Sequence, residues 1–350
     1  MFFKNFNYSS PKRNVKIFFI NMVILFTLIL VLELLLQILK PYDLYQRTSP
    51  NQIKNGTFKP EQIRVDWMRV DTTVGWVCSA SGYLQFANKF YNANKVSYAI
   101  NKEGYRNNLS FTDQITSNKK KIMLLGESFL FGVYVDYNST LVGCLEKLDS
   151  NYQYYNFGIP GYGIDQMFMT FRKYFELINP DAIVLIYIDD DIPRILESYR
   201  SIEGLNKPSY KIFAEDFEYR VDLENNFFLK ILDNSYVLNK FYQKYLDYFA
   251  VSFTKKIFSQ IRKELKKNMI VIRWPRKEML GWEKIDWYYD LSGYCAENDI
   301  RFINLADLFV NFSSEKIQSF YLQYDGHPSK EGNKYVAEKL YEKTKGLFTN

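Results

Sequence analysis

The stretch that decides the fold is KIMLLGES at residues 121–128, where an apolar run ends at a glycine, a glutamate and a serine. Short apolar runs bounded by a turn signal are typical of strands buried on both faces of a sheet. In a parallel sheet, residues that follow such a strand lie at its carboxyl edge, where ligands bind. The sequence therefore predicts a buried strand that presents Ser128 at that edge.

Four further runs have the same character, and helical patterns lie between or after them. The other expected strands are 153–158, 182–188, 268–273 and 300–305, and the expected helices are 139–149, 164–178, 253–267, 282–297 and 330–346. Strands that alternate with helices predict an α/β fold with a parallel sheet covered on both faces. Residues 194–252, rich in Tyr and Phe, interrupt this alternation and are interpreted as an insertion in a domain at 119–350.

The N-terminal region predicts a membrane anchor. Residues 1–16 carry four of the six net positive charges and no acid, and residues 17–39 are almost wholly apolar. As a helix, this run would span about 35 Å, more than the roughly 30 Å of a hydrocarbon core. Its positive flank predicts a cytoplasmic tail at 1–16, a transmembrane helix at 17–39, and a location outside the cytoplasm for the rest. Residues 41–118 are interpreted as a stalk and cap region.

The composition excludes several kinds of chemistry. His327 is the only histidine, so metal sites and mechanisms that need two imidazoles are excluded. Cys78, Cys144 and Cys295 have no zinc-binding spacing and allow at most one internal disulfide. Outside its N-terminal tail the chain is nearly neutral, which argues against a nucleic-acid partner. We expect neither a metal nor another cofactor.

The motif DGHP at residues 325–328 supplies a partner for Ser128. Asp325 lies two residues before His327, just ahead of the last expected helix. A carboxylate can hold one imidazole nitrogen so that the other faces a serine hydroxyl. Alone, a serine at this point is as well explained as a helix cap. Together, the two motifs predict a catalytic site made of Ser128, His327 and Asp325.

The order of these motifs resembles the SGNH/GDSL hydrolases. The resemblance rests on GESFLFG at 126–132, NFGIPGYG at 156–163, an acidic strand end and DGHP at 325–328. The phrase INKEGYR at 100–106, with the N-terminal helix, is similar to the membrane-anchored bacterial branch. The resemblance implies a flavodoxin-like three-layer α/β/α sandwich and an enzyme that cleaves or transfers acyl groups.

The resemblance also implies a role for each site residue. Ser128 would be the nucleophile, with its own backbone N–H as one donor to the oxyanion of the tetrahedral intermediate. His327 would be the base and Asp325 its orienting partner. A second oxyanion donor would come from Gly161, with Gly158 as the alternative.

The third sequence block departs from the family pattern. Residues 189–191 read Asp-Asp-Asp where the family commonly has Gly-Asn-Asp, so Asp190 stands in place of an oxyanion-binding asparagine. An ionised carboxylate cannot donate a hydrogen bond, and losing one such donor costs about 10²–10³ in rate. Four alternatives remain open. Mutual repulsion keeps Asp190 protonated and able to donate, the register differs, the acids bind a cation, or the site is slow.

These observations predict a membrane-anchored serine esterase or O-acyltransferase outside the cytoplasm. By the resemblance and the location, its expected substrates are O-acetyl groups of cell-envelope glycans, with a membrane acyltransferase as a candidate partner. A hydrolase of lipid esters is one alternative. A catalytically impaired glycan-binding or partner subunit is the other, and Asp190 is the residue that supports it.

Overall fold

The computed structural model describes residues 11–39, 67–79, 82–86, 96–107, 110–111, 118–196, 199–200, 205–206, 235–265, 268–277, 280, 289–323 and 325–345. The chain divides into two compact units. One comprises Met1–Arg47 and Leu223–Leu246, and the other comprises Thr48–Asp222 and Asp247–Asn350. The second unit contains the sheet and every candidate site residue.

The first unit contains the long N-terminal helix α1 (Pro11–Leu39). Its segment Asn14–Leu35 has a mean hydropathy of 2.7 over 22 residues and is exposed along its length, so α1 is long and apolar enough to cross a membrane. Helices of this kind also occur in signal sequences. The helix includes all of the expected span 17–39 and begins earlier, inside the expected tail.

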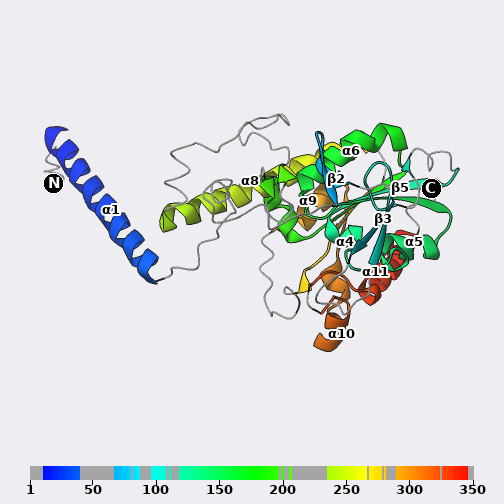
Figure 1. The fold of residues 1–350 in the computed structure, drawn as a ribbon. Coiled ribbons are helices and arrows are strands. Elements are labelled where there is room, and N and C mark those ends of the chain that lie inside the picture. Colours follow the sequence, from blue (N-terminus) through cyan, green and yellow to red (C-terminus); the bar gives the residue numbers. More distant parts are fainter. Residues whose placement is uncertain are drawn as a thin grey trace, which may run out of the picture. The chain divides into compact units, whose positions relative to one another are not determined.

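In the described part of the chain, the central sheet has five parallel strands in the order β11-β10-β7-β5-β6 (Figure 1). These are β5 (Lys120–Gly126), β6 (Tyr152–Gly158), β7 (Ala182–Tyr187), β10 (Asn268–Arg273) and β11 (Arg301–Asn304). All residues of β7 are buried, as are the last five of β5. The predicted parallel sheet, buried on both faces, is confirmed.

Helices cover both faces of this sheet. They are α4 (Ser128–Phe131), α5 (Leu141–Leu148), α6 (Ile164–Ile178), α8 (Tyr236–Leu265), α9 (Ser292–Glu297), α10 (Ser314–Ser319) and α11 (Lys330–Thr344), with 3-10 helices at Tyr137–Ser139, Asp189–Asp191, Pro193–Leu196 and Leu305–Leu308. Figure 1 shows α6 and the end of α8 on one side and α5 and α11 on the other. Leu141 of α5 and Val336 of α11 share one buried apolar cluster with the strands. The three-layer α/β/α architecture is therefore confirmed.

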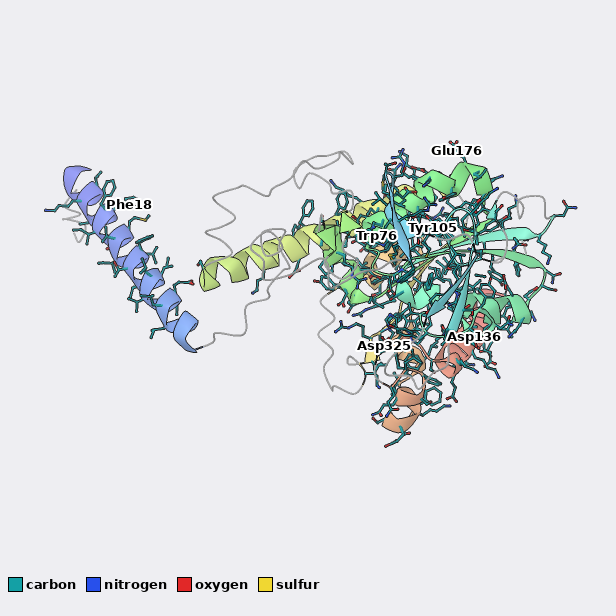
Figure 2. All side chains as sticks on the ribbon, viewed as in Figure 1. Phe18, Trp76, Tyr105, Asp136, Glu176 and Asp325 are labelled. Atoms are coloured by element: carbon teal, nitrogen blue, oxygen red, sulfur yellow. The ribbon has the colours of Figure 1, made fainter. Side chains whose placement is uncertain are left out.

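The described part of residues 41–118 packs in the same compact unit as the sheet. It forms two antiparallel pairs, β1 (Met68–Asp71) with β2 (Gly75–Cys78) and β3 (Gly82–Phe86) with β4 (Val96–Ile100). Trp76 and Tyr105 are fully buried and lie among the packed side chains in Figure 2. These segments contact the sheet edge that carries Ser128: Trp76 donates to the carbonyl of Pro160.

Two expected helices have different limits. Helix α8 begins at Tyr236, inside the expected insertion 194–252, which also contains the short pair β8 (Tyr199–Arg200) and β9 (Leu205–Asn206). Tyr and Phe, abundant at the start of α8, favour strands by propensity and conceal this helix.

The helix expected at 282–297 begins only at Ser292, and residues 281–288 lie outside the described residues. The carboxylate of Asp290 accepts a hydrogen bond from the N–H of Ser292, a local turn that competes with helix. Cys78, Cys144 and Cys295 are all free.

Candidate active site

Ser128 is the first residue of α4 and lies at the carboxyl edge of the sheet, directly after β5 and Glu127. Its side chain is largely buried. The helix is only four residues long and ends at Gly132, whose φ of +77° is the left-handed conformation that glycine adopts without strain. The GESFLFG motif thus makes a sharp strand–helix turn with the serine hydroxyl at its start.

The structure brings the three predicted catalytic side chains together. His327 Nε2 lies 2.8 Å from Ser128 Oγ, and His327 Nδ1 contacts Asp325 Oδ1. The loop is held by a hydrogen bond of 2.7 Å from the N–H of Leu322 to the carbonyl of His327. With Nδ1–H donating to the carboxylate, Nε2 has a free lone pair that can accept the serine proton.

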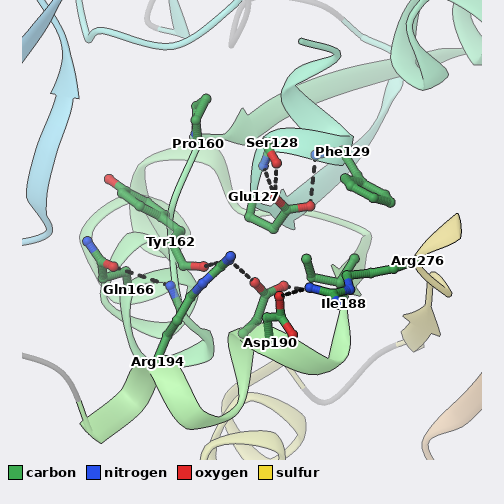
Figure 3. A network of polar contacts seen from close by, with 12 residues as sticks. Glu127, Ser128, Phe129, Pro160, Tyr162, Gln166, Ile188, Asp190, Arg194 and Arg276 are labelled. Atoms are coloured by element: carbon green, nitrogen blue, oxygen red, sulfur yellow. Dashed lines mark hydrogen bonds and ion pairs between the residues drawn. The ribbon is translucent and has the colours of Figure 1, made fainter. Parts of the chain in front are cut away.

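Glu127 also contacts Ser128, which the sequence did not predict. One of its carboxylate oxygens, Oε2, contacts both the hydroxyl and the backbone N–H of Ser128. The other oxygen accepts a hydrogen bond of 2.8 Å from the N–H of Phe129 (Figure 3). In this structure, the Ser128 N–H expected to bind the oxyanion is therefore occupied by a carboxylate of the protein.

The two glycines considered as second oxyanion donors have different surroundings. The N–H of Gly158 donates to Asn156 Oδ1 at 2.9 Å. Gly161 has a φ of +82°, and its N–H has no hydrogen-bond partner within the described ranges. Gly161 is thus the better placed of the two to receive a substrate oxygen.

The loop that carries Gly161 is fixed by contacts from three other segments, and Figure 3 shows those of Arg194 and Gln166. Trp76 Nε1 of β2 donates to the carbonyl of Pro160 at 3.1 Å, and Arg194 Nη1 donates to the carbonyl of Tyr162 at 3.1 Å. The side-chain oxygen of Gln166 accepts a hydrogen bond from the N–H of Gly163. A donor on a loop held this firmly is pre-organised for a developing negative charge.

Each of the three acids at 189–191 is paired with its own arginine. The pairs are Asp189 with Arg273, Asp190 with Arg276, and Asp191 with Arg194. In the first two pairs, a guanidinium nitrogen lies 2.6 Å from a carboxylate oxygen. Asp190 is an acceptor here, and all three carboxylates are neutralised by guanidinium groups.

Asp191 is the most buried of the three acids. Burial raises its pKa, and the guanidinium of Arg194 opposes that shift. The second oxygen of Asp191 accepts a hydrogen bond of 2.9 Å from the N–H of Ile188. No group of three or more His, Cys, Asp or Glu suited to a metal is found within the described residues.

Arg106 supports the short helix α4, which begins with Ser128, and was not predicted as a site residue. It is fully buried and donates to the carbonyls of Phe131 at 3.0 Å and Val135 at 2.7 Å. Its guanidinium also lies 4.4 Å from the ring centre of Tyr98. Arg106 therefore holds the carbonyl end of α4, the helix that begins with Ser128. The signal in the sequence was the phrase INKEGYR at 100–106, which ends with this arginine.

No protein-family model matches the chain, and no relative is found among curated proteins. Among solved structures, the chain is similar to a lipolytic protein of the G-D-S-L family from Veillonella parvula (17% identity, 64% of this chain and 97% of that chain covered, TM-score 0.38). It is also similar to a lipase/acylhydrolase from Enterococcus faecalis (13%, 65% and 96%, 0.40) and a family 3 carbohydrate esterase from Clostridium thermocellum (16%, 66% and 98%, 0.39).

Proposed function

We propose that the chain is a serine-type ester hydrolase or acyltransferase. The observation that carries this proposal is the 2.8 Å contact between Ser128 Oγ and His327 Nε2, with Asp325 on the other ring nitrogen. This arrangement fits activation of a hydroxyl for attack on an acyl carbonyl. Ser128 lies on a turn between strand and helix, so its position is set by the fold as well as by its partners.

In the first half of the reaction, His327 Nε2 takes the proton of Ser128 Oγ as the oxygen bonds to the acyl carbon. The carbonyl oxygen becomes an oxyanion, for which the N–H of Gly161 is the free donor. When the intermediate collapses, the bond to the ester oxygen breaks and His327 returns the proton to the departing alcohol. The acyl group is then bound to Ser128 as an ester.

In the second half, the acceptor is water or another hydroxyl. His327 removes its proton, the acceptor oxygen attacks the acyl carbon, and Ser128 Oγ leaves and regains a proton from His327. The Glu127 carboxylate contacts both the hydroxyl and the N–H of Ser128. It must therefore release the hydroxyl for the proton to pass to His327, and the N–H for that group to serve the oxyanion. Asp325 keeps Nδ1 protonated throughout and stabilises the imidazolium that forms in each half.

Within this function, we propose that the protein is anchored by α1 with its catalytic unit outside the cytoplasm. The positive residues before the apolar segment Asn14–Leu35 favour that orientation. A hydrolase or transferase placed there would meet O-acetyl groups of cell-envelope glycans. This substrate class rests on the predicted location and on the family that the sequence resembles, and a membrane acyltransferase is the partner that would fit it.

The decisive test is labelling of the full-length protein in detergent with a fluorophosphonate. We expect a covalent adduct on Ser128, located by mass spectrometry of the peptide. The variants Ser128→Ala and His327→Ala should lose the label, whereas Ser139→Ala, a serine on a neighbouring turn, should keep it. Absence of an adduct on Ser128 in the unmodified chain would overturn the proposal.

The substrate class requires a second measurement. We expect the full-length protein to release acetate from O-acetylated polysaccharide and to act poorly on p-nitrophenyl palmitate. The reverse preference would favour a lipid-ester hydrolase. Transfer is distinguished from hydrolysis by adding a de-acetylated glycan as acceptor and following the appearance of new esters on it.

A binding subunit without catalysis is the second candidate. Two observations favour it: Asp190 accepts rather than donates, and Glu127 occupies the N–H of Ser128. Such a protein would retain a glycan but would neither label with fluorophosphonate nor turn over any ester. The labelling experiment therefore separates the two candidates directly.

A further inference from the structure

The three arginines that pair with residues 189–191 differ in their access to solvent. The side chain of Arg273 is 3% exposed and that of Arg194 is 13% exposed, whereas that of Arg276 is 42% exposed. The first two guanidinium groups are enclosed in the fold, where they neutralise buried acids. Arg276 is the member of the set that a molecule entering from solvent can meet.

Arg276 belongs to a segment, 274–277, that contacts residues next to Ser128 and next to the loop of His327. The ring of Trp274 packs edge-to-face against Phe129, the residue after the nucleophile, with 5.7 Å between ring centres. On the other side, the hydroxyl of Tyr321 donates to the carbonyl of Pro275 at 2.7 Å, just ahead of the loop that carries the histidine. The segment is thereby held by the residue that follows Ser128 and by a residue that precedes the loop of His327.

Asp190 fixes the direction of the Arg276 side chain. It follows β7, the strand next to β5, so it lies at the same sheet edge as Ser128. Its Oδ2 accepts from Arg276 Nη1 at 2.6 Å (Figure 3). A carboxylate at this point cannot donate to a carbonyl oxygen, but a guanidinium has five N–H donors and a permanent positive charge.

Resting on the function proposed above, we propose that Arg276, aimed by Asp190, stabilises the oxyanion of the tetrahedral intermediate. In this assignment Arg276 is the oxyanion-binding residue and Asp190 its positioning residue. Arg276 supplies N–H donors and a positive charge that Asp190 alone cannot supply. The Asp190 carboxylate balances that charge in the resting site, before negative charge develops on the acyl oxygen.

This assignment predicts a specific non-additivity between two substitutions. In Asp190→Asn, the new side-chain amide is itself a donor, so the need for Arg276 disappears. Removing Arg276 should therefore lower kcat strongly in the wild-type protein and only slightly in the Asp190→Asn variant. If the two residues acted independently, removing Arg276 would lower kcat by the same factor in both proteins.

The experiment compares the full-length protein in detergent with Arg276→Gln, Asp190→Asn and the double variant, using p-nitrophenyl acetate. We expect Arg276→Gln to lower kcat about 10²–10³-fold with little change in KM. Binding of phenylboronic acid, whose serine adduct is tetrahedral and anionic, should weaken by a similar factor. In the Asp190→Asn background, Arg276→Gln should change kcat less than about tenfold.

Arg262→Gln is the matched control, since Arg262 forms an ion pair of 2.7 Å with the exposed Asp299. It should leave kcat unchanged. If Arg276→Gln unfolds the protein, Arg276→Lys replaces it; Lys retains the charge without the planar fork, and an intermediate kcat is expected.

Two results would overturn this inference: equal kcat in wild type and Arg276→Gln, or the same loss of kcat in the wild-type and Asp190→Asn backgrounds. In either case, labelling of Ser128 by the fluorophosphonate would leave the proposed function intact. Failure of the wild type to label would remove both.

Discussion

The two sides of Ser128 are built differently. On the side of His327, Nε2 lies 2.8 Å from Ser128 Oγ and Nδ1 contacts Asp325, as the order of the motifs in the sequence predicts. On the oxyanion side, carboxylates and arginines occupy the positions where neutral donors were expected. Glu127 holds the N–H of Ser128, and Asp190 accepts from Arg276.

The difference shows how much freedom each half of such a site has. Proton transfer needs one base with its nitrogen within about 3 Å of the hydroxyl, and few residue types can provide it. Oxyanion stabilisation needs only positive potential and N–H groups aimed at one point, which backbone, amide or guanidinium groups can all supply. We therefore expect substitutions on the histidine side to have larger and more uniform effects than substitutions on the oxyanion side.

The largest effect should follow removal of the base. His327→Ala leaves Ser128 without a proton acceptor, and kcat/KM should fall by roughly 10⁴–10⁶-fold. Asp325→Asn should cost about 10⁴-fold, because the imidazole loses the partner that fixes its tautomer. Both are measured by ester hydrolysis with the full-length protein. If His327→Ala retained most of its activity, the base would lie elsewhere and the contrast between the two sides would vanish.

The next largest effect concerns Gly161 and Gly158, the two glycines considered as second oxyanion donors. An alanine at Gly161 would be held at a φ of +82°, which costs roughly 1–2 kcal/mol and shifts the N–H. We expect Gly161→Ala to fold and to lose about 10²–10³ in kcat.

Gly158→Ala should behave differently, because its Cβ would lie 2.4 Å from the backbone nitrogen of Phe131. It should lower the urea midpoint of unfolding before it affects chemistry. A stable, inactive Gly158 variant beside an active Gly161 variant would reverse the assignment of the donor.

The contrast between the two sides also explains what the sequence could predict. The sequence predicted the five strands, helix α6 and the meeting of Ser128, His327 and Asp325. These features depend on apolar runs, helical periodicity and short motifs, which are local in the chain. The pairs of Asp189 with Arg273 and of Asp190 with Arg276 join residues 84 and 86 positions apart. Nothing in the local sequence around residues 189–191 indicates which distant arginine will meet each acid.

Glu127 illustrates a second limit. Its position beside Ser128 was visible in the motif, but its contacts depend on a side-chain conformation that spacing does not specify. The role of Arg106 was hidden for a different reason: its phrase lies before the first strand of the sheet, in a region interpreted as stalk and cap. The role of Arg106 becomes visible only when this region packs against α4, where the guanidinium binds the carbonyl of Phe131.

A substitution of Arg106 tests whether the contacts on both sides of Ser128 depend on the position of helix α4. Burial lowers its pKa to about 10, so the guanidinium stays charged at neutral pH and binds the carbonyl end of α4. Arg106→Met keeps the volume but leaves these carbonyls unpaired, and we expect a loss of about 1.5–3 kcal/mol in the free energy of unfolding. The measurement is urea unfolding followed by circular dichroism.

Arg69→Met is the matched control for Arg106. Arg69 is exposed and makes one long contact of 3.5 Å to the carbonyl of Glu103, so the change should stay within about 0.5 kcal/mol. The Arg106 variant should also lose kcat, since both sides of Ser128 depend on α4. Full stability with full activity would mean that α4 keeps its position without the arginine.

The smallest effect is expected at an ion pair outside the contacts around Ser128. Lys173 Nζ of α6 lies 2.6 Å from Asp71 Oδ2 of β1. Burial alone would raise the pKa of Asp71, but hydrogen bonds from Lys173 and from the N–H groups of Val74 and Thr73 outweigh it and lower the pKa.

A carboxyl with a lowered folded-state pKa adds stability above its unfolded pKa of about 3.9 and loses that contribution as the pH falls through the folded value. Lys173→Ala should therefore cost about 0.2–1 kcal/mol at pH 7, and the difference from wild type should shrink below about pH 4. Urea midpoints measured across this range give the comparison. Because the pair lies outside the contacts around Ser128, we expect kcat to stay unchanged. A change in kcat would mean that the loop that carries Gly161 depends on the β1–β2 pair through more than the contact of Trp76 with Pro160.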